Sequence, residues 1–224
     1  MKRAILNSTM KIRNLSKITA NLKKSAVCFV VVCTSVAAWG QTMPGGRVVP
    51  WEILKNEAAN GNKDFQYFVG KIYLEGSDTY FANVPGRLDT KVDVDKVQAV
   101  YWLRKAAEQR VAAAEHELGA CYSLGEGVNE DDEQALYWFR RAAEQGHSLA
   151  QANLGIYYQE GYGVEKDGNH ALYWFEKAIE NKDNSLGDNV AAIRRIIKEL
   201  KDAGYSSSVA AQIYEKKVDY EVLE

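Results

Sequence analysis

Cysteine is scarce in this sequence, with three residues at positions 28, 33 and 121 of a 224-residue chain. Cys28 and Cys33 lie in an N-terminal segment that we expect to be removed, so the remaining chain keeps only Cys121. A single cysteine excludes an internal disulfide framework, even in an oxidising compartment. We predict that Cys121 is a buried, small apolar residue rather than a reactive thiol.

The sequence also lacks an apolar run of membrane-spanning length near its start. The run at residues 26–38 has thirteen residues, against the roughly 20 that a transmembrane helix needs. A basic stretch precedes it, and Ala38-Trp39-Gly40 follows with small residues where a signal peptidase cleaves. We predict a signal peptide at residues 1–40 and a periplasmic or secreted chain that leaves the membrane once the signal is removed. A transmembrane anchor is the alternative.

Positive charge is depleted over the rest of the chain. Residues 1–40 hold seven Lys or Arg residues and no Asp or Glu, which leaves 21 basic against 30 acidic residues, a net charge of −9. Nucleic-acid binding needs a basic surface that displaces counterions. The composition therefore argues against a nucleic-acid partner.

Catalytic and metal-binding motifs are missing as well. The sequence has no His-Glu-x-x-His, Gly-x-Ser-x-Gly or Cys-x-x-Cys motif. The one Ser-x-x-Lys match, Ser8 to Lys11, lies in the predicted signal peptide. His116, His147 and His170 are isolated from one another and from cysteine, so surface positions are expected for them. We predict no catalytic residue, no metal site and no cofactor.

What the sequence does contain is a repeat of 36 residues. Residues 118–146 carry Leu-Gly, Tyr, Gly-x-Gly-Val, Asp, Ala, Tyr-Trp-Phe and Ala-Ala in that order, and this pattern returns 36 residues later. Its second half also occurs 36 residues earlier, from Ala99 to Ala107. Apolar positions at helical spacing within such a period are typical of a helix-turn-helix solenoid.

This order of motifs resembles the Sel1-like repeat, a relative of the tetratricopeptide repeat, over about residues 57–181. The resemblance implies an all-α fold, an α/α solenoid of helix-turn-helix repeats with terminal capping helices. It also implies a protein partner, and some exported Sel1-like proteins neutralise toxic effectors as immunity proteins. A cysteine-rich branch is associated with penicillin binding and β-lactamase activity, but its paired cysteines are not found here.

Repeat spacing predicts three parts after the signal peptide. These are a lead-in and capping helix at 41–62, three repeats at 63–182, and C-terminal capping helices at 183–224. Gly70 aligns with Gly119 at an offset of 49, which is 13 more than the period. We therefore predict a 13-residue insertion within residues 77–94 that either contacts a partner or folds back on its own repeat.

Within each repeat the pattern also assigns local roles. Asp131 and Asp167 are expected to be N-caps or first-turn acids of the second helices, and Gly125 and Gly161 are expected to end the first helices. Each second helix carries Ala, Trp, Phe and Ala at i, i+3, i+4 and i+7, from Ala135 and from Ala171. We predict that this stripe forms the core rather than a binding site.

The first helices of a helical solenoid line its concave side, where ligands bind. Taking Leu118 as a core residue, 100° per residue points another set of side chains to the opposite face. That set, with the two aromatics of the insertion, is the predicted partner-binding surface: Tyr67, Lys71, Leu74, Tyr80, Phe81, His116, Ser123, Ile156 and Gln159. The alternative is that part of this face packs on neighbouring helices.

The sequence thus favours an exported, non-enzymatic scaffold or adaptor that binds an unknown protein or peptide. An acidic body suits a basic target through electrostatic steering. The alternative from another class is a β-lactam- or peptidoglycan-fragment-binding protein with β-lactamase-like activity.

Overall fold

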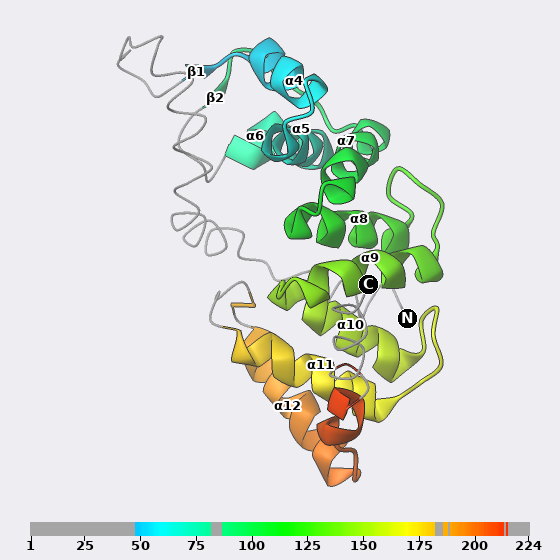
Figure 1. Ribbon diagram of the computed structural model, residues 1–224. Coiled ribbons are helices and arrows are strands. Elements are labelled where there is room, and N and C mark those ends of the chain that lie inside the picture. The colour runs from blue at the N-terminus through cyan, green and yellow to red at the C-terminus, as the bar shows by residue number, and fades with distance from the viewer. Residues whose placement is uncertain (1–47, 82–86, 182–185, 188, 213, 215–224) are drawn as a thin grey trace. The chain divides into compact units, whose positions relative to one another are not determined.

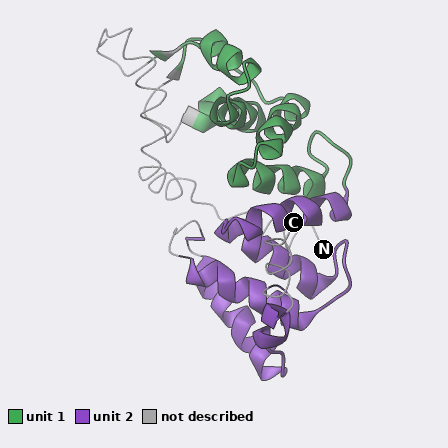
Figure 2. Cartoon of the chain, in the orientation of Figure 1, with its two compact units in different colours: residues 1–130 green, residues 131–224 purple. Residues whose placement is uncertain are grey.

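The computed structural model describes residues 48–81, 87–181, 186–187, 189–212 and 214. The predicted signal peptide, most of the lead-in and the end of the tail lie outside these residues. The chain divides into two units, Met1–Glu130 and Asp131–Glu224, coloured separately in Figure 2. The described part is almost entirely helical, which confirms the predicted α/α solenoid class of helix-turn-helix repeats (Figure 1).

The described part of unit 1 consists of helices and two very short strands. Its elements in chain order are β1 (Val48–Val49), α4 (Trp51–Ala59), α5 (Lys63–Glu75), α6 (Ser77–Phe81), β2 (Arg87–Leu88), α7 (Lys96–Glu108) and α8 (Ala112–Leu124). Helix α4 packs on α5, α5 on α7 and α7 on α8. The capping helix α4 begins directly after Pro50, whose carbonyl accepts hydrogen bonds from the Ile53 and Leu54 N–H groups at 3.2 and 3.3 Å.

The insertion folds back on its own repeat, the second of the two predicted alternatives. The Val92 N–H donates to the Ser77 hydroxyl at 3.0 Å, and the Ser77 N–H donates to the Val92 carbonyl at 2.8 Å. Leu88 and Val92 are buried in one core cluster with Trp51 and Leu54 of the capping helix. The insertion therefore joins the capping helix to the first repeat, and β2 pairs in parallel with β1.

Unit 2 contains four labelled helices: α9 (Asp132–Glu144), α10 (Ser148–Glu160), α11 (Gly168–Glu180) and α12 (Asn189–Asp202). Helix α10 packs on both α9 and α11, and α12 packs on α11. Residues 207–212 are also helical. Helices are therefore found within residues 183–224, where C-terminal capping helices were predicted.

Equivalent contacts recur at the repeat spacing. Asp95, Asp131 and Asp167, each 36 residues apart, accept hydrogen bonds from backbone N–H groups of the helix that follows. Gly125 and Gly161 end α8 and α10 in the left-handed conformation, with φ of 67° and 78°. The Ala-Trp-Phe-Ala stripes of α9 and α11 are buried. The predicted caps, helix ends and burial of the stripes are therefore confirmed.

A buried amide also recurs. The Gln66 side-chain amide donates to the Ala58 carbonyl at 3.0 Å, and the Gln151 amide donates to the Ala143 carbonyl at 3.1 Å. Each glutamine thereby satisfies a carbonyl at the end of the preceding helix, eight residues earlier. Glu115 occupies the equivalent position in α8 and is fully buried.

Candidate partner-binding surfaces

Three of the predicted binding residues lie on α5. Tyr67, Lys71 and Leu74 are all partly exposed. Lys71 is the centre of an ion cluster: its Nζ lies 2.5 Å from Glu75 Oε1 on the same helix and 2.9 Å from Glu117 Oε1 on α8. The side chains of Lys71, Glu75 and Glu117 are 15 %, 24 % and 21 % exposed. Together with Tyr67, these three residues form the α5–α8 face.

The electrostatics of this face are set by its two carboxylates. Burial acts to lower the pKa of Lys71, but Glu117, Tyr67 and Glu75 outweigh it and raise that pKa well above its ordinary value. Lys71 therefore carries its charge throughout the physiological range. One ammonium faces two carboxylates, so the ionised cluster keeps an excess negative charge.

The central lysine of the cluster is not repeated in the later first helices. At the repeat spacing, Ala120 and Ile156 occupy the positions that correspond to Lys71. Both of these apolar residues are buried. The equivalent helices α8 and α10 therefore pack with an apolar residue at this position, whereas α5 carries a lysine there.

Three predicted binding residues are not available on the surface. His116, Ser123 and Ile156 are buried, at 9 %, 2 % and 6 % exposed. The prediction from 100° per residue assumed that each first helix is buried on one side only. In α10, however, ten of the thirteen residues are buried. For these residues the alternative of packing within the fold holds, and His116 is not the surface histidine that was expected. Gln159 is partly exposed.

The two aromatic residues of the insertion have different outcomes. Tyr80 is partly buried and packs against the core cluster that contains Trp51 and Val92. The Tyr80 backbone N–H donates to the Gly76 carbonyl at 3.0 Å. The side chain of Phe81 lies outside the described residues. Tyr80 therefore has a packing role that the sequence could not separate from partner binding.

Cys121 is buried, as predicted. Burial, with the nearby carboxylates of Glu117 and Glu126, raises the pKa of its thiol to about 12. A thiol with such a pKa is almost entirely protonated near pH 7 and is a poor nucleophile. Among the described residues, no group of three or more His, Cys, Asp or Glu side chains could hold a metal ion.

A second group of surface residues was not singled out from the sequence. Tyr101, Tyr137 and Tyr173, each 36 residues apart, pair edge-on with the tryptophan that follows at centroid distances of 5.0, 4.9 and 5.1 Å. Tyr101 and Tyr137 are half exposed. A cation four residues later lies over each tyrosine ring: Lys105, Arg141 and Lys177. The recurring Tyr-Trp pair with a basic residue at i+4 was visible in the sequence and could have marked these residues.

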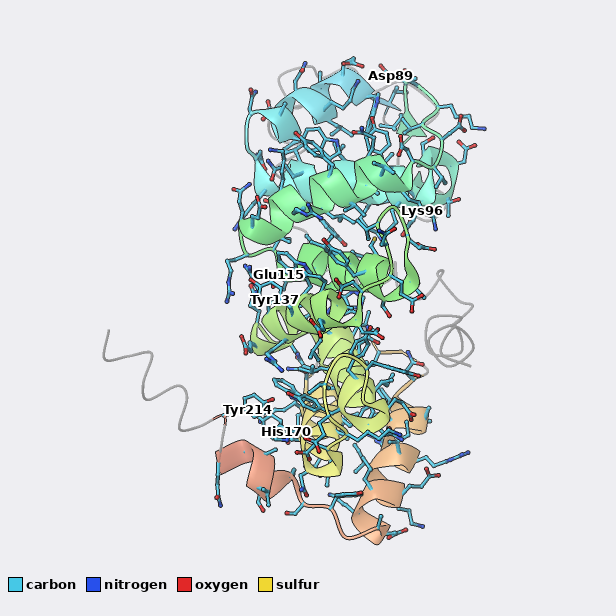
Figure 3. All side chains as sticks on the ribbon, turned by 90° about the vertical axis from the view of Figure 1, so that its right-hand side faces the viewer. Asp89, Lys96, Glu115, Tyr137, His170 and Tyr214 are labelled. Carbon is cyan, nitrogen blue, oxygen red and sulfur yellow. The ribbon has the colours of Figure 1, made fainter. Side chains whose placement is uncertain are left out.

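The third of these pairs has an additional aromatic neighbour. Tyr214 stacks on Tyr173 with centroids 5.0 Å apart and planes at 13°. It meets Trp174 edge-on at 5.0 Å and accepts a hydrogen bond from Trp174 Nε1 at 3.1 Å. Figure 3 shows Tyr214 beside His170, with which it makes a further edge contact at 5.7 Å.

No helix in the described ranges is long and apolar enough to cross a membrane. This finding concerns those residues alone, and the predicted signal peptide lies outside them.

Comparison with known proteins identifies the repeat. The Sel1 repeat profile matches residues 63–85, 86–111, 112–147 and 148–183, which is more than half of the chain. The first two matches contain α5 and α7, which pack on each other around the insertion. No curated protein matches the chain.

Several solved structures are similar. A Sel1 repeat protein from Oxalobacter formigenes is 33 % identical, with a TM-score of 0.50 over 58 % of this chain and 90 % of that protein. A protective antigen of uropathogenic Escherichia coli is 25 % identical, with a TM-score of 0.41 over 73 % and 43 %. Cysteine-rich protein B of Helicobacter pylori is 24 % identical, with a TM-score of 0.42 over 60 % and 94 %.

The repeat spacing, the recurring caps and glycines, and the four profile matches agree with one another, and the chain therefore belongs to the Sel1 repeat family, which is generally non-enzymatic and whose repeats serve as protein-interaction scaffolds.

Proposed function

We propose that the chain is an exported scaffold that binds a protein partner through the α5–α8 face. The observation that carries this proposal is the partly buried Glu75–Lys71–Glu117 cluster, which joins the first helices of two successive repeats. Tyr67, also on α5, is close enough to raise the pKa of Lys71.

The cluster is better explained by recognition than by stability. Buried ion pairs contribute little net stability, because the cost of removing the charges from water offsets their attraction. The residues that correspond to Lys71 in α8 and α10 are Ala120 and Ile156, which are apolar and buried. The fold therefore does not require a lysine at position 71.

The chemistry of the face suits a basic partner. Two carboxylates flank a single ammonium, so the face offers charged acceptors to an arginine or lysine from the partner. Tyr67 adds a partly exposed aromatic ring of the kind that is enriched at interfaces. The acidic composition of residues 41–224 would steer such a partner toward the chain.

Export remains part of the proposal and rests on the sequence of residues 1–40. A narrower form is that the chain neutralises a toxic, basic effector as an immunity protein. Expression of the full chain, followed by fractionation and N-terminal sequencing, tests export. A mature N-terminus near residue 41 in the periplasm or medium supports it, and an intact chain in the cytoplasm contradicts it.

Site-specific photo-cross-linking tests the binding face. A photoreactive phenylalanine analogue replaces Tyr67 in one full-length protein and Glu108, an exposed residue of α7, in a matched control. We expect one discrete cross-linked protein in the cell envelope from position 67 and none from position 108. The same product from both positions, or none from position 67, would contradict the assignment.

Two substitutions then test the cluster itself. Lys71→Met removes the ammonium while preserving much of the side-chain volume, and Glu117→Gln removes one carboxylate. If the partner supplies a basic group, Glu117→Gln weakens capture by about tenfold, which is the size of one charged hydrogen bond. Lys71→Met leaves capture unchanged or strengthens it, because the face becomes more negative. Stronger capture by Glu117→Gln would refute a basic partner.

A further inference from the structure

One of the three Tyr-Trp pairs is covered by another aromatic residue of the same chain. At Tyr173 and Trp174 on α11, the occupant is Tyr214 of the same chain. Its ring stacks on the tyrosine, and its hydroxyl accepts the indole hydrogen bond from Trp174 Nε1. The Tyr158 hydroxyl lies 3.4 Å from the same oxygen. A phenol suits both members of the pair, because its apolar face stacks on Tyr173 and its hydroxyl accepts the hydrogen bond from Trp174.

The corresponding pair on α9, also in unit 2, has no such occupant among the described residues. Tyr137, labelled in Figure 3, is 49 % exposed. Trp138 is 8 % exposed, and its Nε1 is buried without a hydrogen-bond partner in the described part of the chain. An unsatisfied buried donor costs about 1–3 kcal/mol. An acceptor that reaches Trp138 Nε1 would recover part of that free energy.

Arg141 currently covers this pair. Its guanidinium lies 5.7 Å from the centroid of Tyr137 and 5.0 Å from that of Trp138, and its Nη1 donates to the Tyr137 hydroxyl at 3.1 Å. Moving this side chain would break the hydrogen bond to Tyr137 and both ring contacts, so a bound group must offset their loss. The cover is a side chain, whereas the Tyr-Trp pair beneath it is held by α9.

We propose that Tyr137 and Trp138 form a docking site for a tyrosine side chain of a partner protein. The incoming ring stacks on Tyr137, Arg141 moves away, and the phenol oxygen accepts the hydrogen bond from Trp138 Nε1. The occupant is a tyrosine because the chain itself uses one at the equivalent pair. This inference rests on the proposed function only in taking the tyrosine from a protein, and it concerns a surface other than the α5–α8 face.

The test uses the full chain with 15N-labelled tryptophan, so that each indole N–H gives a separate NMR signal. The probe is a synthetic peptide with the sequence of residues 207–217, which contains one tyrosine, Tyr214. The matched control peptide carries phenylalanine at that position. We expect the Trp138 signal to shift with the tyrosine peptide and roughly tenfold weaker binding of the control, since it lacks the acceptor oxygen.

Two variants separate binding from folding. Tyr137→Ala removes the stacking platform and is expected to weaken peptide binding about tenfold while the Trp138 and Trp174 signals of the free protein persist. Arg141→Ala removes the cover and is expected to strengthen binding several-fold, which a residue with only a structural role would not do. The Trp138 signal itself is identified by its loss in Trp138→Phe.

Three outcomes would overturn the inference. They are an unmoved Trp138 signal at millimolar peptide, equal binding of the tyrosine and phenylalanine peptides, and a shift of Trp174 in place of Trp138. The last would mean that the peptide exchanges with the chain's own Tyr214. Because the probe is a defined peptide, these results do not depend on whether the cross-linking experiment at Tyr67 finds a partner.

Discussion

Gly163 lies in the turn between α10 and α11, and replacing it with alanine tests how tightly that turn is built. Its φ is +61°, in the region where a residue with a side chain costs roughly 1–2 kcal/mol more than glycine. A Cβ at this position would also lie 2.7 Å from both the carbonyl carbon and oxygen of Asp132, and 2.9 Å from the Glu133 nitrogen. These are backbone atoms at the start of α9, so no side-chain rotation relieves the overlap.

Gly204 supplies the matched control in the same unit. It also has a positive φ, +91°, but a Cβ there would meet nothing within 4 Å. Gly204→Ala is therefore expected to cost the conformational penalty alone, about 1–2 kcal/mol. Gly163→Ala adds the overlap, which at about 1–3 kcal/mol for a forced backbone shift brings its total to about 2–5 kcal/mol.

Urea unfolding of the full chain measures both costs. Tryptophan fluorescence reports on both units, through Trp51 and Trp102 in unit 1 and through Trp138 and Trp174 in unit 2. The midpoint and slope of a transition together give its free energy of unfolding. If the two units unfold in separate transitions, the variants are compared in the transition that the substitutions shift. Equal losses for Gly163→Ala and Gly204→Ala would refute the reasoning, because the turn would then tolerate a Cβ against the α9 backbone.

Three further predictions concern buried and charged groups. Glu115→Gln is expected to raise the free energy of unfolding by about 1 kcal/mol at pH 8, since an amide can donate to a backbone carbonyl as the two equivalent glutamines do; a loss of stability in urea would contradict this. Burial acts to raise the pKa of Asp167, but hydrogen bonds from His170 and Asn169 outweigh it and lower that pKa. The stabilisation of the fold by ionised Asp167 is therefore complete above the ordinary pKa of about 4 and is lost as pH falls through the lowered pKa. The difference in unfolding free energy between the unchanged chain and Asp167→Asn should shrink only below about pH 4. A constant difference from pH 5 to pH 2 would argue against this. Cys121 should react with a thiol reagent at pH 8 only after the chain is unfolded, because its thiol pKa is about 12; labelling of the native protein at the rate of free cysteine would show that the thiol is accessible.

The repeats could be read from the sequence because their signals are local. The capping aspartates, the turn glycines and the Ala-Trp-Phe-Ala stripes each depend on residues within about one helical turn of one another. The insertion could be bounded by comparing the repeats, because Gly70 and Gly119 mark equivalent positions on either side of it. Its conformation could not, since it depends on Ser77 meeting Val92 and on the capping helix.

The binding surface was harder to predict, since exposure depends on every element that packs against a helix. Counting 100° per residue from Leu118 gives the direction of a side chain but not the elements that pack against it. The predicted surface therefore included His116 and Ile156, which are buried. It also included Lys71, but the partner that completes the ion cluster, Glu117, is 46 residues away in the sequence. No local pattern connects these two residues.

The sequence alone therefore determined the repeat, its helices and the family, because period and caps are properties of neighbouring residues. Only the tertiary structure decided which side chains are exposed and which distant charges and rings meet. Tyr137 and Tyr173 occupy the same position in their repeats, yet one is half exposed and the other is stacked against Tyr214. That difference comes from a segment 41 residues beyond Tyr173, and it arises from packing rather than from the repeat itself.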